Sequence, residues 1–113
     1  MAQNIRIRAA GGTYSIRAGG AVIGETSDAV ELIEGDHAPV LYIPRSDLAM
    51  ALLEKSDSHT HDPHKGDATY YSVQTKSQLI RDAAWSYETP RAEAAGIAGY
   101  LSFNSPLVAV EEI

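Results

Sequence analysis

The chain has 113 residues, no cysteine and a formal net charge of −6. This length predicts a single domain over residues 1–113 with its own core, and the missing cysteines exclude disulfides, thiolate catalysis and thiolate zinc sites. The acidic balance disfavours nucleic acid as a partner, and no apolar run is long enough for a membrane-spanning helix. Because no signal peptide is visible either, we expect a cytoplasmic protein.

The first third of the chain has the pattern of β-strands. Isoleucine and arginine alternate over residues 5–8, which is the period of a half-buried strand. Glycine pairs at 11–12 and 19–20 separate short runs and predict tight hairpin turns. Residues 27–34 fit either a strand or a short helix, whereas the apolar run at 39–44 predicts a buried strand.

One short helix is predicted at about residues 46–55. Ser46 can cap its first backbone N–H groups, and apolar residues recur on one face between positions 48 and 53. The polar cluster at 56–58 predicts the end of this helix, because its side chains compete for backbone hydrogen bonds. The narrow apolar face is typical of a single helix that lies across one side of a sheet.

The second half of the chain predicts two further hairpins. Residues 68–75 and 78–88 are rich in aromatic and β-branched side chains and fit one antiparallel pair. Residues 90–96 fit a connector or one helical turn, and 97–103 with 107–113 fit a last hairpin. We therefore expect a mainly β (α+β) domain of antiparallel sheets with one helix.

Three histidines form an H-x-H-x-x-H pattern at His59, His61 and His64. In an extended segment the first two share a face, and the third could fold back to complete a site for zinc, nickel or copper. However, no H-E-x-x-H helix or cysteine supports such a site, and Pro63 restricts the turn. We therefore predict no metal and no cofactor, and the three-histidine site remains the alternative.

A second set of residues predicts a pocket for a small ligand. Lys65 and Arg45 could neutralise an anionic group, while tyrosines and the single tryptophan could form an apolar wall with polar tips. Asp82 could pair with Lys65 or accept a hydrogen bond, and on a regular strand it would face away from Trp85 and Tyr87. The structural alternative is that Trp85 and one tyrosine belong to the core. The candidate ligand-binding residues are Arg45, Lys65, Tyr70, Asp82, Trp85 and Tyr87.

Four motifs stand out along the chain: YIPRSDL (42–48), THDPHKGDATYY (60–71), DAAWSYETP (82–90) and IAGYLSF (97–103). In this order and spacing they resemble a bacterial family known as domain of unknown function 427, which sometimes carries a provisional nucleotidyltransferase label. The resemblance covers about Val40 to Val108. The resemblance implies a β-tent-like fold, in which two antiparallel sheets pinned at one edge enclose a pocket. The family often has cysteine where this chain has Asp62, so neither thiol chemistry nor a structural zinc is carried over.

We thus expect a bacterial domain that binds a small ligand, an anionic one included, in an aromatic-lined pocket. One alternative is an enzyme that uses Lys65 and Asp82, either nucleotidyltransferase-like or metal-assisted. The chain shows no pair of acidic metal ligands with a phosphate-binding glycine loop, which such a transferase needs. The other alternative is a structural or interaction module, most simply a homodimer formed through an exposed strand edge.

Overall fold

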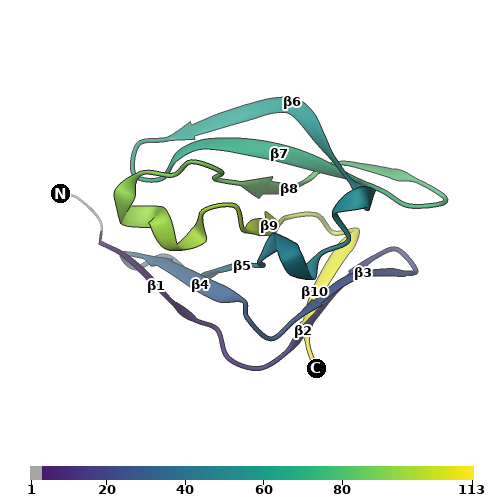
Figure 1. Cartoon of the computed structure of the whole chain (residues 1–113), viewed down its shortest axis with the longest axis horizontal. Helices are drawn as coiled ribbons and strands as arrows, with labels where there is room; N and C mark the ends of the chain where they lie inside the picture. The colour runs from purple at the N-terminus through teal and green to yellow at the C-terminus, as the bar shows by residue number, and fades with distance from the viewer. Residues whose placement is uncertain (1–3) are drawn as a thin grey trace.

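A computed structural model describes residues 4–113 and divides them into three antiparallel sheets (Figure 1). The sheets have the strand orders β1-β4-β5, β10-β2-β3 and β6-β7-β8-β9. The strands are β1 (Ile5–Ala9), β2 (Tyr14–Ala18), β3 (Ala21–Thr26), β4 (Val30–Glu34), β5 (Val40–Tyr42), β6 (Leu53–Asp62), β7 (Gly66–Gln74), β8 (Leu79–Ser86), β9 (Leu101–Phe103) and β10 (Val108–Glu112). Three 3-10 helices, η1 (Arg45–Asp47), η2 (Met50–Leu52) and η3 (Ala92–Ile97), complete the elements found in residues 4–113. The predicted mainly β class with antiparallel sheets is confirmed.

The two glycine pairs of the first third have different roles. Gly19 and Gly20 form the predicted hairpin turn, because Ala18 of β2 faces Ala21 of β3 in the ladder. The pair at 11–12 does not form a hairpin, since β1 pairs with β4 and β2 lies in another sheet. Gly11 and Gly12 both have positive φ, of 76° and 73°, and they turn the chain from one sheet into the next.

The segment predicted as one helix at 46–55 contains two short 3-10 turns instead. Residue Pro44 stands at the N-cap of η1, and no side chain, Ser46 included, caps the turn. The chain then enters β6 at Leu53 and stays extended through 56–58, where the helix was predicted to end. Two apolar residues of this segment, Leu48 and Leu53, are buried in the core, although the segment does not form a helix with a continuous apolar face. A segment this short has little helical stability of its own, so packing decides its shape.

The predicted last hairpin is also absent from residues 4–113. Strand β9 pairs with β8, whereas β10 pairs with β2 in another sheet. This pairing buries Val108, which is 8% exposed, beside residues of β2 in the main core. Two short apolar runs that flank a turn do not specify each other as partners when other strands can bury them better.

A pair of hydrogen bonds joins the edges of two sheets. The amide N of Ile43, just beyond β5, donates to the carbonyl O of Leu101 in β9 at 2.7 Å, and the amide N of Leu101 donates back at 2.8 Å. Both residues are at most 1% exposed. The β1-β4-β5 sheet and the four-stranded sheet are therefore pinned at this edge. The family resemblance implied two pinned sheets, and the described residues form a third one, β10-β2-β3, in addition.

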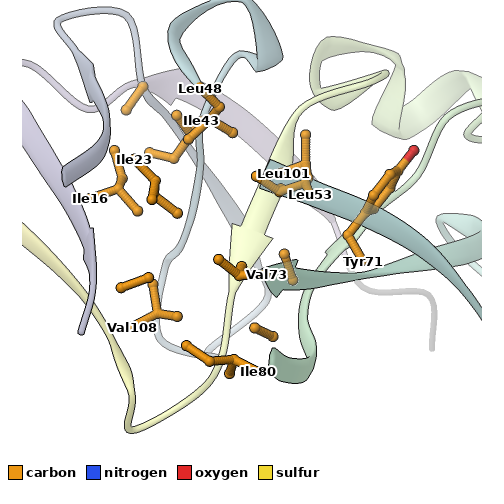
Figure 2. Close-up of a cluster of buried hydrophobic side chains, with 14 residues drawn as sticks. Ile16, Ile23, Ile43, Leu48, Leu53, Tyr71, Val73, Ile80, Leu101 and Val108 are labelled. Atoms are coloured by element: carbon orange, nitrogen blue, oxygen red, sulfur yellow. The ribbon is translucent and has the colours of Figure 1, made fainter. Parts of the chain in front are cut away.

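The four-stranded sheet is covered on both faces. On one face, the main core packs it against the β10-β2-β3 sheet, as Figure 2 shows with side chains such as Ile16, Val73 and Leu101. On the other face, a second cluster that includes Leu32 and Tyr42 packs it against β4, β5 and η3. In Figure 1 the four-stranded sheet runs across the top, with β1 and β4 below it on the left and β2 and β3 on the right. No helix of the described residues is long and apolar enough to cross a membrane.

Candidate functional site

A cavity of about 380 Å³ opens beside the second cluster, between the β1-β4-β5 sheet and the four-stranded sheet. Its aromatic lining consists of Tyr42 from β5, Tyr70 from β7, Trp85 from β8, and Tyr87 just after β8. Its polar lining consists of Glu34, His37, Lys65, Asp82 and Asn104. The cavity therefore combines several aromatic rings with a few polar groups, which is the composition of small-molecule sites.

Strand alternation explains which aromatic residues reach this cavity. The neighbouring residues Tyr70 and Tyr71 of β7 point to opposite faces, as successive residues of a strand do. Tyr70 lies with the second cluster and lines the cavity, and its hydroxyl lies 3.0 Å from the Thr60 hydroxyl. Tyr71 belongs to the main core on the far face, so it is not part of the aromatic wall.

Asp82 lines the same cavity as Trp85 and Tyr87, and the prediction that it would face away from them is wrong. The β7–β8 ladder is irregular at this point, because its register shifts between Tyr71 and Val73. Asp82 occupies the shift with a φ of 49°, a left-handed conformation that aspartate tolerates better than most residues. Such a bulge redirects a side chain to the other face of the sheet, and no alternation pattern in the sequence reveals it.

The carboxylate of Asp82 is held by hydroxyl groups rather than by Lys65. The Ser56 hydroxyl donates to Asp82 Oδ1 and the Ser58 hydroxyl to Oδ2, each at 2.6 Å. These hydrogen bonds are the largest cause that lowers the pKa of Asp82. The two serines belong to the polar cluster at 56–58, so this cluster positions an acidic group instead of ending a helix.

Lys65 lies in the turn between β6 and β7 and forms two ion pairs. Its Nζ donates to Glu34 Oε1 at 2.9 Å and to Asp62 Oδ2 at 3.0 Å, and its side chain is only 11% exposed. The expected alternative, an ion pair between Lys65 and Asp82, is therefore not the one that forms. Burial by itself lowers the pKa of Lys65, but the hydrogen bonds to Glu34 and Asp62 outweigh burial and raise it. The side chain is thus a fixed ammonium at neutral pH.

Asp62 organises this turn. Its Oδ1 accepts hydrogen bonds from the backbone N of His64 at 2.8 Å and of Lys65 at 3.0 Å, which is an Asx-turn. Burial alone raises the pKa of Asp62, yet the hydrogen bonds from Lys65 and the backbone outweigh it and lower the pKa. Asp62 therefore supplies a carboxylate that shapes the turn and holds Lys65.

The aromatic residues at the base of the cavity contact one another. The indole Nε1 of Trp85 donates to Tyr42 Oη at 3.2 Å, and the two rings meet edge-on at 90° with centroids 6.5 Å apart. The Lys65 ammonium lies 5.9 Å from the centroid of Tyr87. Burial raises the pKa of Tyr87 to about 12 and also raises that of Tyr42, so both hydroxyls stay neutral at physiological pH.

Arg45 does not line the cavity and lies in a separate cluster of charged and polar groups. Its guanidinium donates to Glu88 Oε2 at 2.9 Å and to the Gly99 carbonyl O at 2.8 Å, and it lies 5.7 Å from the centroid of Tyr71. The Tyr71 hydroxyl also donates to Glu88, whose other oxygen lies 3.6 Å from Lys55 Nζ. Of the six candidate residues, the structure thus brings together five, namely Lys65, Tyr70, Asp82, Trp85 and Tyr87.

The sequence-based site lacked four polar or aromatic residues that line the cavity: Glu34, His37, Tyr42 and Asn104. They come from β4, β5 and two loops, which are distant in the chain from the 60–87 region. Tyr42 stood within a run predicted as a buried strand, and Glu34 within a generally acidic segment. Neither pattern signals a site, because only the packing of the two sheets places these residues opposite Lys65 and Trp85.

The three histidines of the H-x-H-x-x-H pattern do not form a common site. Within residues 4–113, no group of three or more His, Asp or Glu side chains is arranged to hold a metal ion. His61 Nδ1 lies 2.6 Å from Asp67 Oδ1 across the β6–β7 ladder, and both side chains are exposed. The His64 backbone N–H belongs to the Asp62 turn. The histidine pattern of the sequence is therefore not assembled into a three-ligand site in the part of the chain that the structure describes.

Comparison with known proteins places the chain in a family. No curated protein matches it. Residues 6–112 match the family described as "Domain of unknown function (DUF427)", and the match includes every strand but the first residue of β1. All residues that line the cavity lie within this range. The chain therefore belongs to the DUF427 family.

Proposed function

We propose that this domain binds a small organic molecule in the cavity between the β1-β4-β5 sheet and the four-stranded sheet. The observation that carries this proposal is the lining, in which four aromatic side chains and five polar ones surround about 380 Å³. Small-molecule sites are typically clefts of roughly 300–1,000 Å³ with an aromatic or aliphatic wall and a few convergent polar groups. The geometry of the cavity matches that description.

The state of the aromatic side chains supports the proposal. Trp85 and Tyr70 remain partly exposed beside the cavity, whereas Tyr42 and Tyr87 are buried at 2% and 6% exposure. Apolar ring surface that faces water costs free energy, which a ligand stacked on the rings would recover. The partners of Trp85 and Lys65 hold these two side chains in place, so the site needs little rearrangement to accept a ligand.

No specific observation favours the alternative of an enzyme that uses Lys65 and Asp82. The raised pKa of Lys65 keeps its amine protonated, which makes it a poor base or nucleophile at neutral pH. Asp82 is bound by Ser56 and Ser58 and has a lowered pKa, which makes it a weak proton acceptor. The homodimer remains a prediction, and light scattering over a range of protein concentrations would test it.

Trp85 provides a direct test of ligand binding, because it is the only tryptophan in the sequence. We expect its fluorescence to change in a saturable way when the protein is titrated with members of a chemically diverse metabolite library. Calorimetry with Trp85→Phe should then show a loss of affinity of about tenfold, because the indole surface and its fixed orientation are lost. If no compound changes the fluorescence or the thermal midpoint, ligand binding in this cavity is excluded as the function.

A further inference from the structure

We infer that the ligand is an organic cation with an apolar tail, such as a substituted ammonium compound; this inference rests on the proposed function. Three features of the site support this inference: the balance of charge at the cavity, the aromatic surface available to a cation, and a second, apolar cavity that shares Trp85 with the first. Together these features specify both the sign of the ligand's charge and its shape.

The charge balance at the cavity is negative. Lys65 is the one lysine or arginine among the described residues that line it, whereas both Glu34 and Asp82 contribute carboxylates. Asp62 adds a third carboxylate, because it binds the Lys65 ammonium together with Glu34. An anionic ligand would have to compete with these carboxylates for Lys65. A cationic ligand gains from Asp82, whose partners are neutral hydroxyls.

The aromatic lining favours the same sign of charge. The face of an aromatic ring attracts a cation, and ammonium groups are often bound by several rings with a carboxylate nearby. In this cavity Tyr87 already has the Lys65 ammonium 5.9 Å from its centroid. Trp85 and Tyr70 line the same cavity and remain partly exposed, so their surface is accessible to a ligand. The cavity can therefore surround an ammonium group with ring surface on one side and Asp82 on another.

The shape of the ligand follows from a second cavity of about 340 Å³. It shares Val40, Trp85 and Asn104 with the first cavity, so the two are neighbours along the seam where β5 meets β9. Its remaining lining is mostly apolar and includes Leu41 and Phe103, and none of its described lining residues is ionisable. A tail that passes Trp85 would leave the charged cavity and enter an apolar one. The adjacency of the two cavities, which share Trp85 in their walls, thus favours an amphipathic ligand over a compact one.

A matched set of small compounds tests the charge. Choline and 3,3-dimethylbutan-1-ol have nearly the same shape, but only choline is charged. We expect choline to bind at least about tenfold more tightly than the neutral alcohol, measured by Trp85 fluorescence and calorimetry. The variant Asp82→Asn should abolish most of this preference, because it removes the negative charge. The variant should stay folded, because asparagine tolerates the φ of 49° and can still accept a hydrogen bond from a serine. Its affinity for the neutral alcohol should change much less than its affinity for choline.

A second series tests the tail. From ethyl- to butyl- and hexyltrimethylammonium, affinity should rise about three- to fourfold for each methylene that becomes buried. Leu41→Ala and Phe103→Ala should weaken hexyltrimethylammonium binding more than choline binding. Val22→Ala is the control, because Val22 is 55% exposed on β3 and lines neither cavity. Thermal unfolding of each variant shows whether it is folded. If either Leu41→Ala or Phe103→Ala fails to fold, the other still tests the second cavity.

The outcomes separate this inference from the proposed function. Tighter binding of the cations, dependent on Asp82 and on tail length, supports the inference. If neutral or anionic compounds such as hexanoate bind as tightly as the cations, the inference is overturned while ligand binding at this site stands. Affinity that does not change with tail length overturns the role of the second cavity. If no compound of either series, and no member of the metabolite library, binds near Trp85, the proposed function fails as well.

Discussion

The ammonium of Lys65 lies 2.9 Å from Glu34 Oε1, and this ion pair connects the β6–β7 turn to strand β4 of the opposite sheet. The two sheets are also joined by the backbone bridge between Ile43 and Leu101. One connection is made by a side chain that lines the cavity, and the other by backbone groups beyond the end of β5. The width of the cavity therefore depends on Lys65 as well as on the sheets themselves.

Replacing Lys65 with methionine should lower the free energy of unfolding by about 1–3 kcal/mol. The change leaves Glu34 and Asp62 close together without their shared cation, although both carboxylates keep some contact with water at 18% and 30% exposure. Urea denaturation would measure the effect. The control is Lys76→Met, because Lys76 is exposed and forms no ion pair among the described residues, and its stability should change by less than about 0.5 kcal/mol. Equal effects of the two changes would contradict the role of Lys65.

Stability should fall with acidification below about pH 5. The folded protein lowers the pKa of Asp62 and of Glu88, so their carboxylates stabilise the fold above their ordinary pKa values of about 3.9 and about 4.3. For Glu88, burial alone raises the pKa, but hydrogen bonds from Tyr71 and Arg45 outweigh it. This stabilisation is lost as the pH falls through the lowered pKa values in the folded state. Denaturation curves between pH 6 and pH 3 would measure the loss.

The variant Glu88→Gln should make this acid dependence shallower, because glutamine does not titrate in either state. The matched control is Glu54→Gln, since Glu54 is exposed and its carboxylate forms no ion pair within residues 4–113. An acid dependence in Glu88→Gln as steep as in the unchanged protein would show that Glu88 does not contribute.

Replacing Arg45 with methionine should affect stability but not ligand binding. The change removes the ion pair with Glu88 and the hydrogen bond to the Gly99 carbonyl, and we expect a loss of about 1 kcal/mol because the Arg45 side chain is 38% exposed. Since Arg45 lies outside the cavity, the affinity for any ligand that changes Trp85 fluorescence should stay within about twofold. A loss of affinity without a loss of stability would contradict this prediction and show that Arg45 contributes to ligand binding.

Gly24 and Gly20 form a matched pair for a test of packing. A Cβ at Gly24 would lie 2.7 Å from the Asp47 carbonyl O and 2.8 Å from a Leu48 methyl carbon, so Gly24→Ala must separate β3 from η1. We expect a loss of about 1–3 kcal/mol. Gly20 has no atom within 4 Å of such a Cβ and its φ is not positive, so Gly20→Ala should be neutral or slightly stabilising. Thermal unfolding measures both, and a similar loss in each would contradict the close approach of β3 and η1.

Local patterns in the sequence predicted much of the secondary structure. The alternation at residues 5–8, the hairpin turn at Gly19 and Gly20, and the strands around Tyr70 and Trp85 are present in the structure. These features depend on neighbouring residues, through side-chain alternation and the conformational freedom of glycine, so a short window of sequence contains them. Tyr70, Trp85, Tyr87 and Lys65 of the cavity were recognisable for the same reason, because they cluster within 60–87, whereas Tyr42 lies outside this segment and was not recognised.

The tertiary structure alone decided how these parts are combined. Two features join residues that are distant in the chain: the pairing of β10 with β2 and the ion pair between Lys65 and Glu34. The bulge at Asp82 depends on how β8 pairs with β7. Strand pairing is selected by the apolar surface that it buries over the whole domain, and no local pattern encodes that choice. The sequence by itself thus determined a mainly β chain with an aromatic, lysine-containing segment. The packing of two pinned sheets made that segment the wall of a cavity.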